Sequence, residues 1–213
     1  MRINVLCNDK NSWFWSYKEH FIESIINEGH EVSVHSSEKD MPSGDLAIFI
    51  SCTKIISKEG LLKNTSNIVC HPSDLPKGKG FSPIAWEILD GSNEITFTLF
   101  EANEGVDDGD IYYKETVLLK GDELNDDIRK IQASTTFKLI YKYISRFPEN
   151  KSYSQKGSET FYSKRTPQDS ELDINKTIDN QFNLLRIVDN ERYPAFFIKN
   201  GQKYKIKIEK FND

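Results

Sequence analysis

A histidine and an acidic turn are the residues of this sequence whose types suit proton-transfer chemistry. His71 ends the apolar run "SNIVCH" (66–71), and the glycine-containing turn "EGVDDGD" (104–110) comes shortly after the alternating run "EITFTLFEA" (94–102). A carboxylate beside an imidazole orients the ring and raises its proton affinity. Position alone leaves open that His71 is an ordinary loop histidine and that the turn is a solvated loop. Together, the two indicate proton transfer.

The elements that must position His71 form an alternating pattern of strands and helices. The run "GDLAIFISCT" (44–53) is almost continuously apolar, as is typical of a central strand covered on both faces by helices. Ligands of such sheets bind beyond the carboxyl ends of the strands, where we expect His71. The pattern therefore predicts an α/β sheet. Strands are predicted over 3–7, 31–36, 44–53, 66–71, 94–102 and 110–119, with helices within 16–30, 82–91 and 122–147.

The composition of the chain changes after Pro148. The residues up to about 160 are polar and rich in serine and lysine, which is typical of a surface connection. A helix is predicted over 177–189, and the two runs around Asn200-Gly201 predict a β-hairpin. We therefore expect a main domain over 1–150 and a small C-terminal extension, made of a helix and a β-hairpin, over 151–213.

Composition and charge exclude several classes of protein. The formal net charge is −5, and no basic stripe gives the electrostatic surface of a nucleic-acid binder. No segment approaches the roughly 20 apolar residues that span a bilayer, and the start lacks the apolar core of a secretory signal, so we expect a cytoplasmic protein. The cysteines Cys7, Cys52 and Cys70 lack the paired spacing of a zinc site, and we expect buried thiols and no metal.

The loop "PKGKG" (76–80) and the aromatic run "WFWSY" (13–17) each allow two interpretations. Lys77 and Lys79 lie among glycines, a composition that either holds a phosphate through ammonium and backbone N–H groups or forms a solvated basic loop. The loop lacks the spacing of a P-loop and of a dinucleotide fingerprint. The aromatic run forms either a packing cluster or a surface on which a base stacks, and we favour packing.

The histidine loop and the acidic turn together resemble a known pair of motifs. "HPSDLPKGKGFSP" (71–83), followed by "VDDGD" (106–110), is similar to the H-x-S-x-L-P-x-x-x-G and D-x-G-D motifs of the tetrahydrofolate-dependent formyltransferases, over roughly residues 44–147. Asp107 lies 36 residues after His71 (107 − 71), which matches the separation of the catalytic histidine and aspartate in that family. The resemblance implies a Rossmann-like formyltransferase domain, N10-formyltetrahydrofolate as co-substrate, and His71 and Asp107 as catalytic residues.

The C-terminal segments narrow the resemblance. "KRTPQDSELDI" (164–174) and "RYPAFFIKNGQKYKIKI" (192–208) resemble segments that follow the catalytic domain in sugar-nucleotide N-formyltransferases. They imply formyl transfer to the primary amine of a UDP- or dTDP-linked 4-amino-4,6-dideoxyhexose, for surface polysaccharide or nonulosonic acid synthesis. The alternatives are a formyltransferase acting on another amine, such as glycinamide ribonucleotide, and a non-catalytic folate or nucleotide-sugar binding protein. We expect no nucleic-acid or membrane partner, and the apolar hairpin offers a surface for a homodimer.

One departure from the family motif concerns the residue two positions before the histidine. The family has asparagine there, and this chain has Val69, whose side chain neither donates nor accepts a hydrogen bond. We expect another oxyanion donor, with Ser51, Thr53 and Ser73 as candidates. The resemblance also implies residues that flank the pterin, namely Cys52, Thr53, Ile55, Ile56, Val106 and Asp107. Residues implied at the amine substrate are Ser73, Lys77, Lys79, Gly80 and Arg165.

Overall fold

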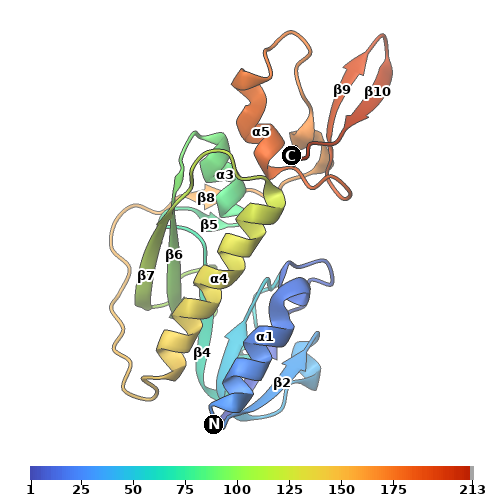
Figure 1. Cartoon of the computed structure of the whole chain (residues 1–213). Coiled ribbons are helices and arrows are strands. Elements are labelled where there is room, and N and C mark those ends of the chain that lie inside the picture. Colours follow the sequence, from blue (N-terminus) through green and yellow to red (C-terminus); the bar gives the residue numbers. More distant parts are fainter. Residues whose placement is uncertain (212–213) are drawn as a thin grey trace.

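A mixed sheet forms the centre of the chain. The computed structural model describes residues 1–211, and within them six strands pair in the order β2-β1-β3-β4-β6-β7 (Figure 1). The four strands β2, β1, β3 and β4 pair in parallel, whereas β6 pairs antiparallel with both of its neighbours, β4 and β7. This arrangement confirms the predicted α/β fold. The strand bounds are β1 Arg2–Leu6, β2 Glu31–His35, β3 Gly44–Phe49, β4 Asn64–His71, β6 Glu94–Glu101 and β7 Ile111–Leu118.

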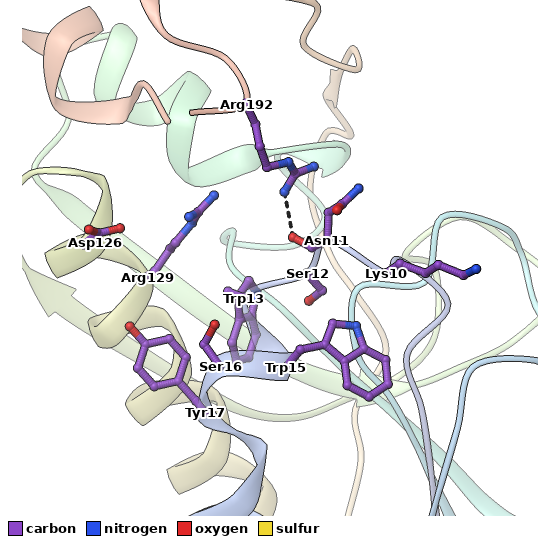
Figure 2. A pocket seen from close by; sticks show the side chains of 10 residues that line it. All are labelled: Lys10, Asn11, Ser12, Trp13, Trp15, Ser16, Tyr17, Asp126, Arg129 and Arg192. Carbon is purple, nitrogen blue, oxygen red and sulfur yellow. Dashed lines mark hydrogen bonds between the residues drawn. The ribbon is translucent and has the colours of Figure 1, made fainter. Parts of the chain in front are cut away.

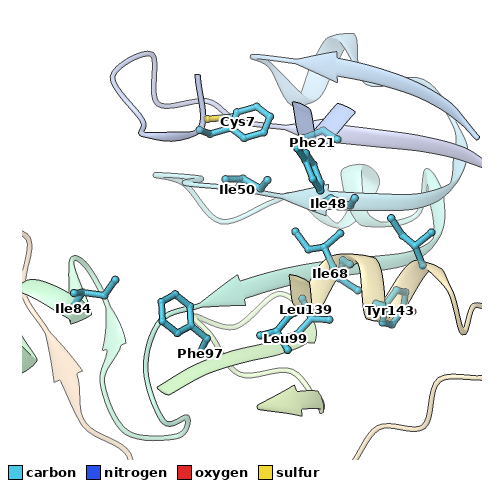
Figure 3. Packing of buried hydrophobic residues seen from close by; sticks show 14 of the residues in the cluster. Cys7, Phe21, Ile48, Ile50, Ile68, Ile84, Phe97, Leu99, Leu139 and Tyr143 are labelled. Carbon is cyan, nitrogen blue, oxygen red and sulfur yellow. The ribbon is translucent and has the colours of Figure 1, made fainter. Parts of the chain in front are cut away.

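Two helices cover one face of the sheet. α1 (Phe14–Asn27) and α4 (Asn125–Ile144) contact each other through Phe21 and Phe137, whose stacked rings have centroids 4.2 Å apart. Buried residues of α4 recur at three- and four-residue spacing, which is the period of one helix face. This face of the sheet therefore carries the main apolar core. Its members include Ile48, Ile68, Leu99, Leu139 and Tyr143 (Figure 3).

The opposite face of the sheet is covered by loops and one short helix. Phe49 and Ala47 pack there with Met41 and Ile56, which come from the loops on either side of β3. The helix on this side, α2, spans only Lys58–Leu61. The expectation that helices cover both faces of the central strand is therefore wrong, because the connection from β3 to β4 holds no more than this single helical turn.

The chain reverses its direction after β4. His71 is the last residue of β4 and pairs with Thr98 of β6, which runs antiparallel to it. The segment between them carries the short strand β5 (Lys79–Gly80) and the helix α3 (Pro83–Leu89), which has proline in its first turn as predicted. β4 therefore delivers His71 to the edge of the sheet at which the parallel strands end.

The C-terminal part ends in a small hairpin. β9 (Ala195–Lys199) and β10 (Gln202–Ile206) pair around Asn200 and Gly201, which both have positive φ, and this confirms the predicted hairpin. The preceding helix is shorter than predicted, since only α5 (Phe182–Ile187) is α-helical. None of the helices within residues 1–211 is long and apolar enough to cross a bilayer. The remaining elements are β8 (Phe161–Tyr162) and 3-10 turns at Glu38–Asp40, Pro167–Ser170 and Asp179–Gln181.

The short length of α5 has a local cause. Gln181, just before the helix, donates its side-chain N–H groups to the backbone carbonyls of Asp173, Lys176 and Thr177. One of these bonds occupies the Thr177 carbonyl, which the predicted helix would use in its own ladder. The residues that were predicted to begin the helix therefore form a loop followed by the 3-10 turn Asp179–Gln181.

Arg186 fixes α5 to the rest of the chain. The residue is 1% exposed, and its guanidinium donates to the carboxylate of Glu123 at 3.2 Å and to the side chain of Asn93 at 2.9 Å. Glu123 precedes α4, and Asn93 precedes β6. Removing one partner of such a buried ion pair strongly destabilises a protein, because the other charge stays buried without a partner. Arg186 therefore anchors the C-terminal part.

Candidate active site

His71 is held at the end of β4 by a backbone carbonyl. The residue is 7% exposed, and its Nε2 lies 2.9 Å from the carbonyl oxygen of Gly78. A carbonyl oxygen only accepts hydrogen bonds, so Nε2 carries a proton. In the neutral ring the lone pair is then on Nδ1, which lies 3.7 Å from Oδ2 of Asp107. The geometry thus assigns Nδ1 as the ring atom that can accept a proton.

Asp107 is fixed in a tight turn between β6 and β7. Its backbone φ is 48°, and its Oδ2 accepts a hydrogen bond from the Gly80 amide at 2.8 Å. Two residues later, a Cβ on Gly109 would lie 1.6 Å from the carbonyl oxygen of Glu101, so the turn closes in this way only with glycine there. The fold therefore brings together His71 and the acidic turn that the sequence singled out.

Val69 is a packing residue at the position where the resembled motif has asparagine. It lies two residues before His71, on the same face of β4. The half-buried side chain packs against the small cluster that contains Phe49 and against a second one that contains Leu75 and Phe100. Position 69 therefore joins two apolar clusters and supplies no hydrogen-bond donor beside His71.

Two of the three candidate oxyanion donors have unsuitable positions. Thr53 is exposed, and both its amide and its hydroxyl lie within hydrogen-bond distance of the side-chain oxygen of Asn8. Ser73 is fully buried, and its hydroxyl has no partner within residues 1–211. A substrate cannot reach a fully buried hydroxyl, so Ser73 is a poor candidate both as donor and as a substrate contact in this structure.

Ser51 has the most suitable geometry of the three. It follows β3 in a left-handed backbone conformation with φ of 50°. Its Oγ accepts a hydrogen bond from the Ser12 hydroxyl at 2.7 Å, which uses a lone pair and leaves the Ser51 proton available. The β3–β4 register ends with Phe49 paired to Val69, so Ser51, two residues after β3, and His71, at the end of β4, lie at the same edge of the sheet.

The comparison with protein families agrees with this geometry. The chain matches the Formyl transferase family over residues 2–142. This chain belongs to the formyl transferase family. The matched range begins in β1 and ends within α4, so it contains the sheet together with His71, Asp107 and the acidic turn. The resemblance that the two motifs indicated is thereby confirmed at the level of the family.

Curated relatives of this formyltransferase-family chain include two methionyl-tRNA formyltransferases. The protein from Coprothermobacter proteolyticus is 26% identical over 201 residues, which cover 93% of this chain and 62% of that protein. The protein from Mycoplasma capricolum is 27% identical over 161 residues, which cover 74% of this chain and 49% of that protein. The chain therefore spans about half to three fifths of the length of these relatives.

Solved structures share the fold. Methionyl-tRNA formyltransferase from Clostridium thermocellum has a TM-score of 0.83 and 19% identity, over 100% of this chain and 94% of that one. A 4-N formyltransferase from Francisella tularensis has a TM-score of 0.71 and 18% identity, over 100% and 98%. HypX from Aquifex aeolicus in complex with tetrahydrofolic acid has a TM-score of 0.73 and 18% identity, over 98% and 37%. At these identities the likeness concerns the fold.

Lys79 of this family member is buried and paired, which corrects the expectation that it faces a phosphate. The residue is 1% exposed, and its Nζ lies 2.7 Å from Oδ1 of Asp108 and 2.7 Å from Oε1 of Glu159. Burial alone lowers the pKa of a lysine, but the two carboxylates raise the pKa of Lys79 above its ordinary value. Its positive charge is therefore balanced by two carboxylates of the protein and is not available to a phosphate. Lys77, by contrast, is exposed.

Two of the residues implied at the pterin present free apolar surface. Ile55, in the loop after β3, is 56% exposed, and Val106, in the acidic turn, is 43% exposed. Ile56 is instead buried in the cluster that contains Phe49. Burial raises the pKa of the Cys52 thiol to about 12, so this side chain is a neutral thiol. Exposed apolar side chains on two loops fit the faces of a flat ring.

Arg165 closes a turn of the C-terminal part. Its Nη2 donates to the backbone carbonyl of Asp169 at 3.0 Å, while its Nε is buried and has no partner among the described residues. Burial lowers the pKa of Arg165 below its ordinary value. Asp169 in turn accepts from the Thr166 amide and hydroxyl. This arrangement gives Arg165 a local structural role in the turn Pro167–Ser170.

Residues 153–162 contact both loops of the site, and we call this segment the strap. Backbone pairing attaches it at both ends, through Tyr153 to Ile111 and through Phe161 to Lys79. The sequence predicts only a surface connection here, because a polar composition gives no signal of long-range contacts. The side chains that it adds to the site are Gln155, Glu159 and Thr160.

An open cavity lies at the start of α1, with a volume of about 280 Å³ (Figure 2). Three cationic side chains line it: Lys10 before α1, Arg129 on α4 and Arg192 from the C-terminal part. Arg192 donates to a backbone carbonyl of the β1–α1 loop at 2.6 Å. Ser12 also lines the cavity and donates to Ser51, so the cavity adjoins the site.

The aromatic run at 13–17 divides between the core and this cavity. Phe14 is fully buried, and Trp13 contacts Phe137 of α4 with ring centroids 5.7 Å apart. Trp13, Trp15 and Tyr17 line the cavity (Figure 2). Packing therefore accounts fully for Phe14, and the other three aromatic residues have surface that a ligand can contact.

Proposed function

We propose that this chain is an N-formyltransferase that uses N10-formyltetrahydrofolate and acts on the primary amine of a nucleotide-linked amino-deoxy sugar. The observation that carries the proposal is the pair formed by His71 and Asp107 at the carboxyl edge of the sheet. The hydrogen bond to Gly78 leaves Nδ1 of His71 as the proton acceptor, and Nδ1 lies 3.7 Å from Asp107. A general base must have its accepting atom directed at the reacting group, and this ring is held in one tautomer.

The chain's residues have separate roles in the transfer. The folate supplies the formyl group, whose bond to N10 is replaced by a bond to the substrate amine. Nδ1 of His71 accepts the proton that the attacking amine loses, and the same proton is returned to the departing N10, so the reaction releases none. Asp107 stabilises the imidazolium that exists between these steps. Ser51 donates a hydrogen bond to the formyl oxygen as negative charge develops on it.

The folate fits the loops at the edge of the sheet. Ile55 and Val106 offer apolar surface from the loop after β3 and from the acidic turn. A pterin ring between two such loops would bury this surface, while backbone groups beside Cys52, Thr53 and Asp107 would read its polar edge. The family supports the folate as co-substrate, since one of the similar structures is a complex with tetrahydrofolic acid.

A nucleotide sugar agrees with the charge beside the site. Phosphate binding needs free cationic groups, and the ammonium group of Lys79 is not free, because it is paired with Asp108 and Glu159. In the cavity at the start of α1, Arg129 is paired with Asp189 at 2.8 Å, whereas Lys10 is exposed and makes no ion pair within residues 1–211. Lys10, together with Lys77, which is exposed on the histidine loop, is therefore the better place for a diphosphate. A similar solved structure, a sugar N-formyltransferase from Shewanella, is covered over 99% of its length, which supports an amine on a sugar as the acceptor.

The proposal is tested by mass spectrometry of the products. Purified protein is incubated with N10-formyltetrahydrofolate and a panel of UDP- and dTDP-linked amino sugars, with glycinamide ribonucleotide and methionyl-tRNA as competing amines. We expect one sugar to gain the mass of a carbonyl group, and the gain to vanish in His71→Ala. The matched control is His20→Ala, because His20 is exposed on α1.

Each other outcome replaces the proposal with a specific alternative. A gain only on glycinamide ribonucleotide or only on methionyl-tRNA overturns the sugar and keeps the formyltransferase. Folate binding without transfer to any amine indicates a binding protein. The missing hydrogen-bond donor at Val69, where the family has asparagine, would then explain the lack of transfer.

A further inference from the structure

The strap connects the two loops that carry the catalytic pair. Its first attachment, Tyr153, exchanges backbone hydrogen bonds of 2.8 and 3.0 Å with Ile111, directly after the acidic turn. Its last attachment is β8, which pairs with β5 in the histidine loop. Between these points the strap crosses from one loop to the other. The segment is therefore placed to set the distance between them.

On the histidine side, Thr160 holds the peptide that orients His71. Its Oγ1 accepts a hydrogen bond from the Gly78 amide at 2.8 Å, and its carbonyl accepts from the Lys79 amide at 2.9 Å. Gly78 in turn presents the carbonyl that binds Nε2 of His71. One residue of the strap thus holds both peptide groups of Gly78: its side chain binds the Gly78 N–H, and its carbonyl binds the peptide that presents the Gly78 carbonyl to His71.

On the aspartate side, Gln155 holds the acidic turn. Its Nε2 donates to the carbonyl oxygens of Asp107 and Gly109, both at 2.9 Å. These two carbonyls directly follow the bend at which Asp107 has positive φ. A single amide group therefore holds the backbone of the turn in the conformation that directs Oδ2 of Asp107 toward Gly80 and His71.

A buried charge joins the three segments at one point. Lys79 of the histidine loop pairs with Asp108 of the acidic turn and with Glu159 of the strap. The lysine side chain is almost completely removed from water, while the two carboxylates are about half exposed. The ammonium group thus links both loops to the strap beneath the catalytic pair.

We propose that the strap positions the catalytic pair, with Thr160 and Gln155 as positioning residues that act through Gly78 and through the turn backbone. The inference rests on the proposed function in one respect only, namely that His71 and Asp107 are the reacting groups. Geometry of this kind matters for rate, because a displacement of about 1 Å in a catalytic group can cost about a hundredfold in rate.

The test compares Thr160→Val with Thr160→Ser and with Thr116→Val. Valine keeps the shape of threonine and removes the acceptor of the Gly78 amide, whereas serine keeps that acceptor. Thr116 shares a hydrogen bond of 2.9 Å with Thr96 on the exposed side of β6 and β7, so its replacement is a matched control. The readouts are kcat and KM for the formyl transfer, and the nitrogen NMR shifts of the His71 ring, which report its tautomer.

We expect kcat of Thr160→Val to fall by about tenfold or more, as a small displacement of the base predicts, with KM changed by less than about twofold. The ring should lose its uniform Nε2–H tautomer, and Thr160→Ser should restore both properties. Either an unchanged tautomer or a kcat equal to that of Thr116→Val overturns the proposal. If the wild-type chain transfers no formyl group, the proposed function fails, and the ring tautomer still decides the role of the strap.

A second variant covers the case in which Thr160→Val does not fold. Gln155→Met keeps the length of the side chain and removes both N–H groups that hold the acidic turn. We expect the backbone NMR signals of residues 104–110 to shift and kcat to fall by at least about tenfold, in line with the same displacement argument. Unchanged signals of the turn overturn the proposal.

Discussion

Replacing Ser51 by alanine should slow formyl transfer by about a hundredfold to a thousandfold. A preorganised donor to a developing oxyanion is worth about 3–4 kcal/mol of transition-state stabilisation, which is the source of this range. The structural cost is small, because the lost hydrogen bond from Ser12 contributes about 1 kcal/mol and Ser12 still accepts one from the Phe14 amide. The effect should therefore appear in kcat, with the protein still folded.

A second change, Val69→Asn, should rescue Ser51→Ala. Asparagine at position 69 puts an amide donor on the same face as His71, two residues away. Losing the half-buried apolar contacts of valine costs about 1 kcal/mol, and burying part of an amide adds about 1–2 kcal/mol. Together these terms lower the melting temperature by about 4–12 °C, since 1 kcal/mol corresponds to about 2–4 °C in a chain of this size. The rescue should recover about tenfold or more of the rate.

The assay is single-turnover transfer from N10-formyltetrahydrofolate, followed by mass spectrometry, for wild type, both single variants and the double variant. Ser12→Ala serves as the control, because it removes the hydrogen bond to Ser51 and leaves the Ser51 hydroxyl in place. Two results would refute the reasoning. A Ser51→Ala rate within about threefold of wild type, far below the loss expected for an oxyanion donor, shows that Ser51 does not act on the formyl oxygen. A large acceleration by Val69→Asn alone shows that the natural chain lacks a donor.

Three further predictions follow from the fold and the turn. Arg186→Met should lower the free energy of unfolding in urea by about 3 kcal/mol, because Glu123 loses its buried partner, and adding Glu123→Gln should recover part of it; an additive double variant would contradict the pairing. Burial, followed by the charges of Asp74 and Asp90, raises the pKa of Glu87 to about 7. The folded state then binds more protons than the unfolded state between about pH 4.5 and 7, so stability should fall as pH rises through this window. Solvent screening of this partly exposed carboxyl keeps the loss to about 1–2 kcal/mol, and Glu87→Gln should flatten the dependence seen in urea melts. Gly109→Ala should reduce kcat at least about tenfold, because the new methyl group would meet the Glu101 carbonyl and displace the turn that carries Asp107; wild-type kinetics would refute the close approach.

Local pattern was sufficient to predict the sheet and the place of His71. The runs at 44–53 and 66–71 are short and apolar, and the helix expected between the strands at 3–7 and 31–36 indicated a parallel unit, which the pairing of β1 with β2 confirms. His71, as the last residue of its apolar run, could therefore be placed at the carboxyl end of a strand. The same holds for the hairpin, because Asn200-Gly201 supplies the two positive φ angles of its turn. These features depend on residues that are neighbours in the chain.

What the sequence did not predict depends on contacts between distant residues. The residues around Lys79 have the composition of a phosphate-binding loop. Its ion pairs are with Asp108 and Glu159, which are distant in the chain, so the local composition does not reveal them. The helices expected on both faces of β3 are present on one, because coverage depends on connection length as well as on apolar character. The division between a domain over 1–150 and an extension over 151–213 stays a prediction, and the strap, which lies after that boundary, pairs with residues before it.

The distance of the strap along the chain has a consequence for protein synthesis. Thr160 lies 82 residues after Gly78, and Glu159 lies 80 residues after Lys79. At about 5–20 residues per second, a ribosome needs roughly 4–16 seconds to span this interval. The six-stranded sheet and the helices α1 and α4 that cover it are complete by Ile144, so this part of a nascent chain can form before the strap emerges. A chain that stops before Gln155 would therefore hold this sheet and lack the support of the strap for His71 and Asp107, so the geometry of the proposed catalytic pair is completed late in the synthesis of each molecule.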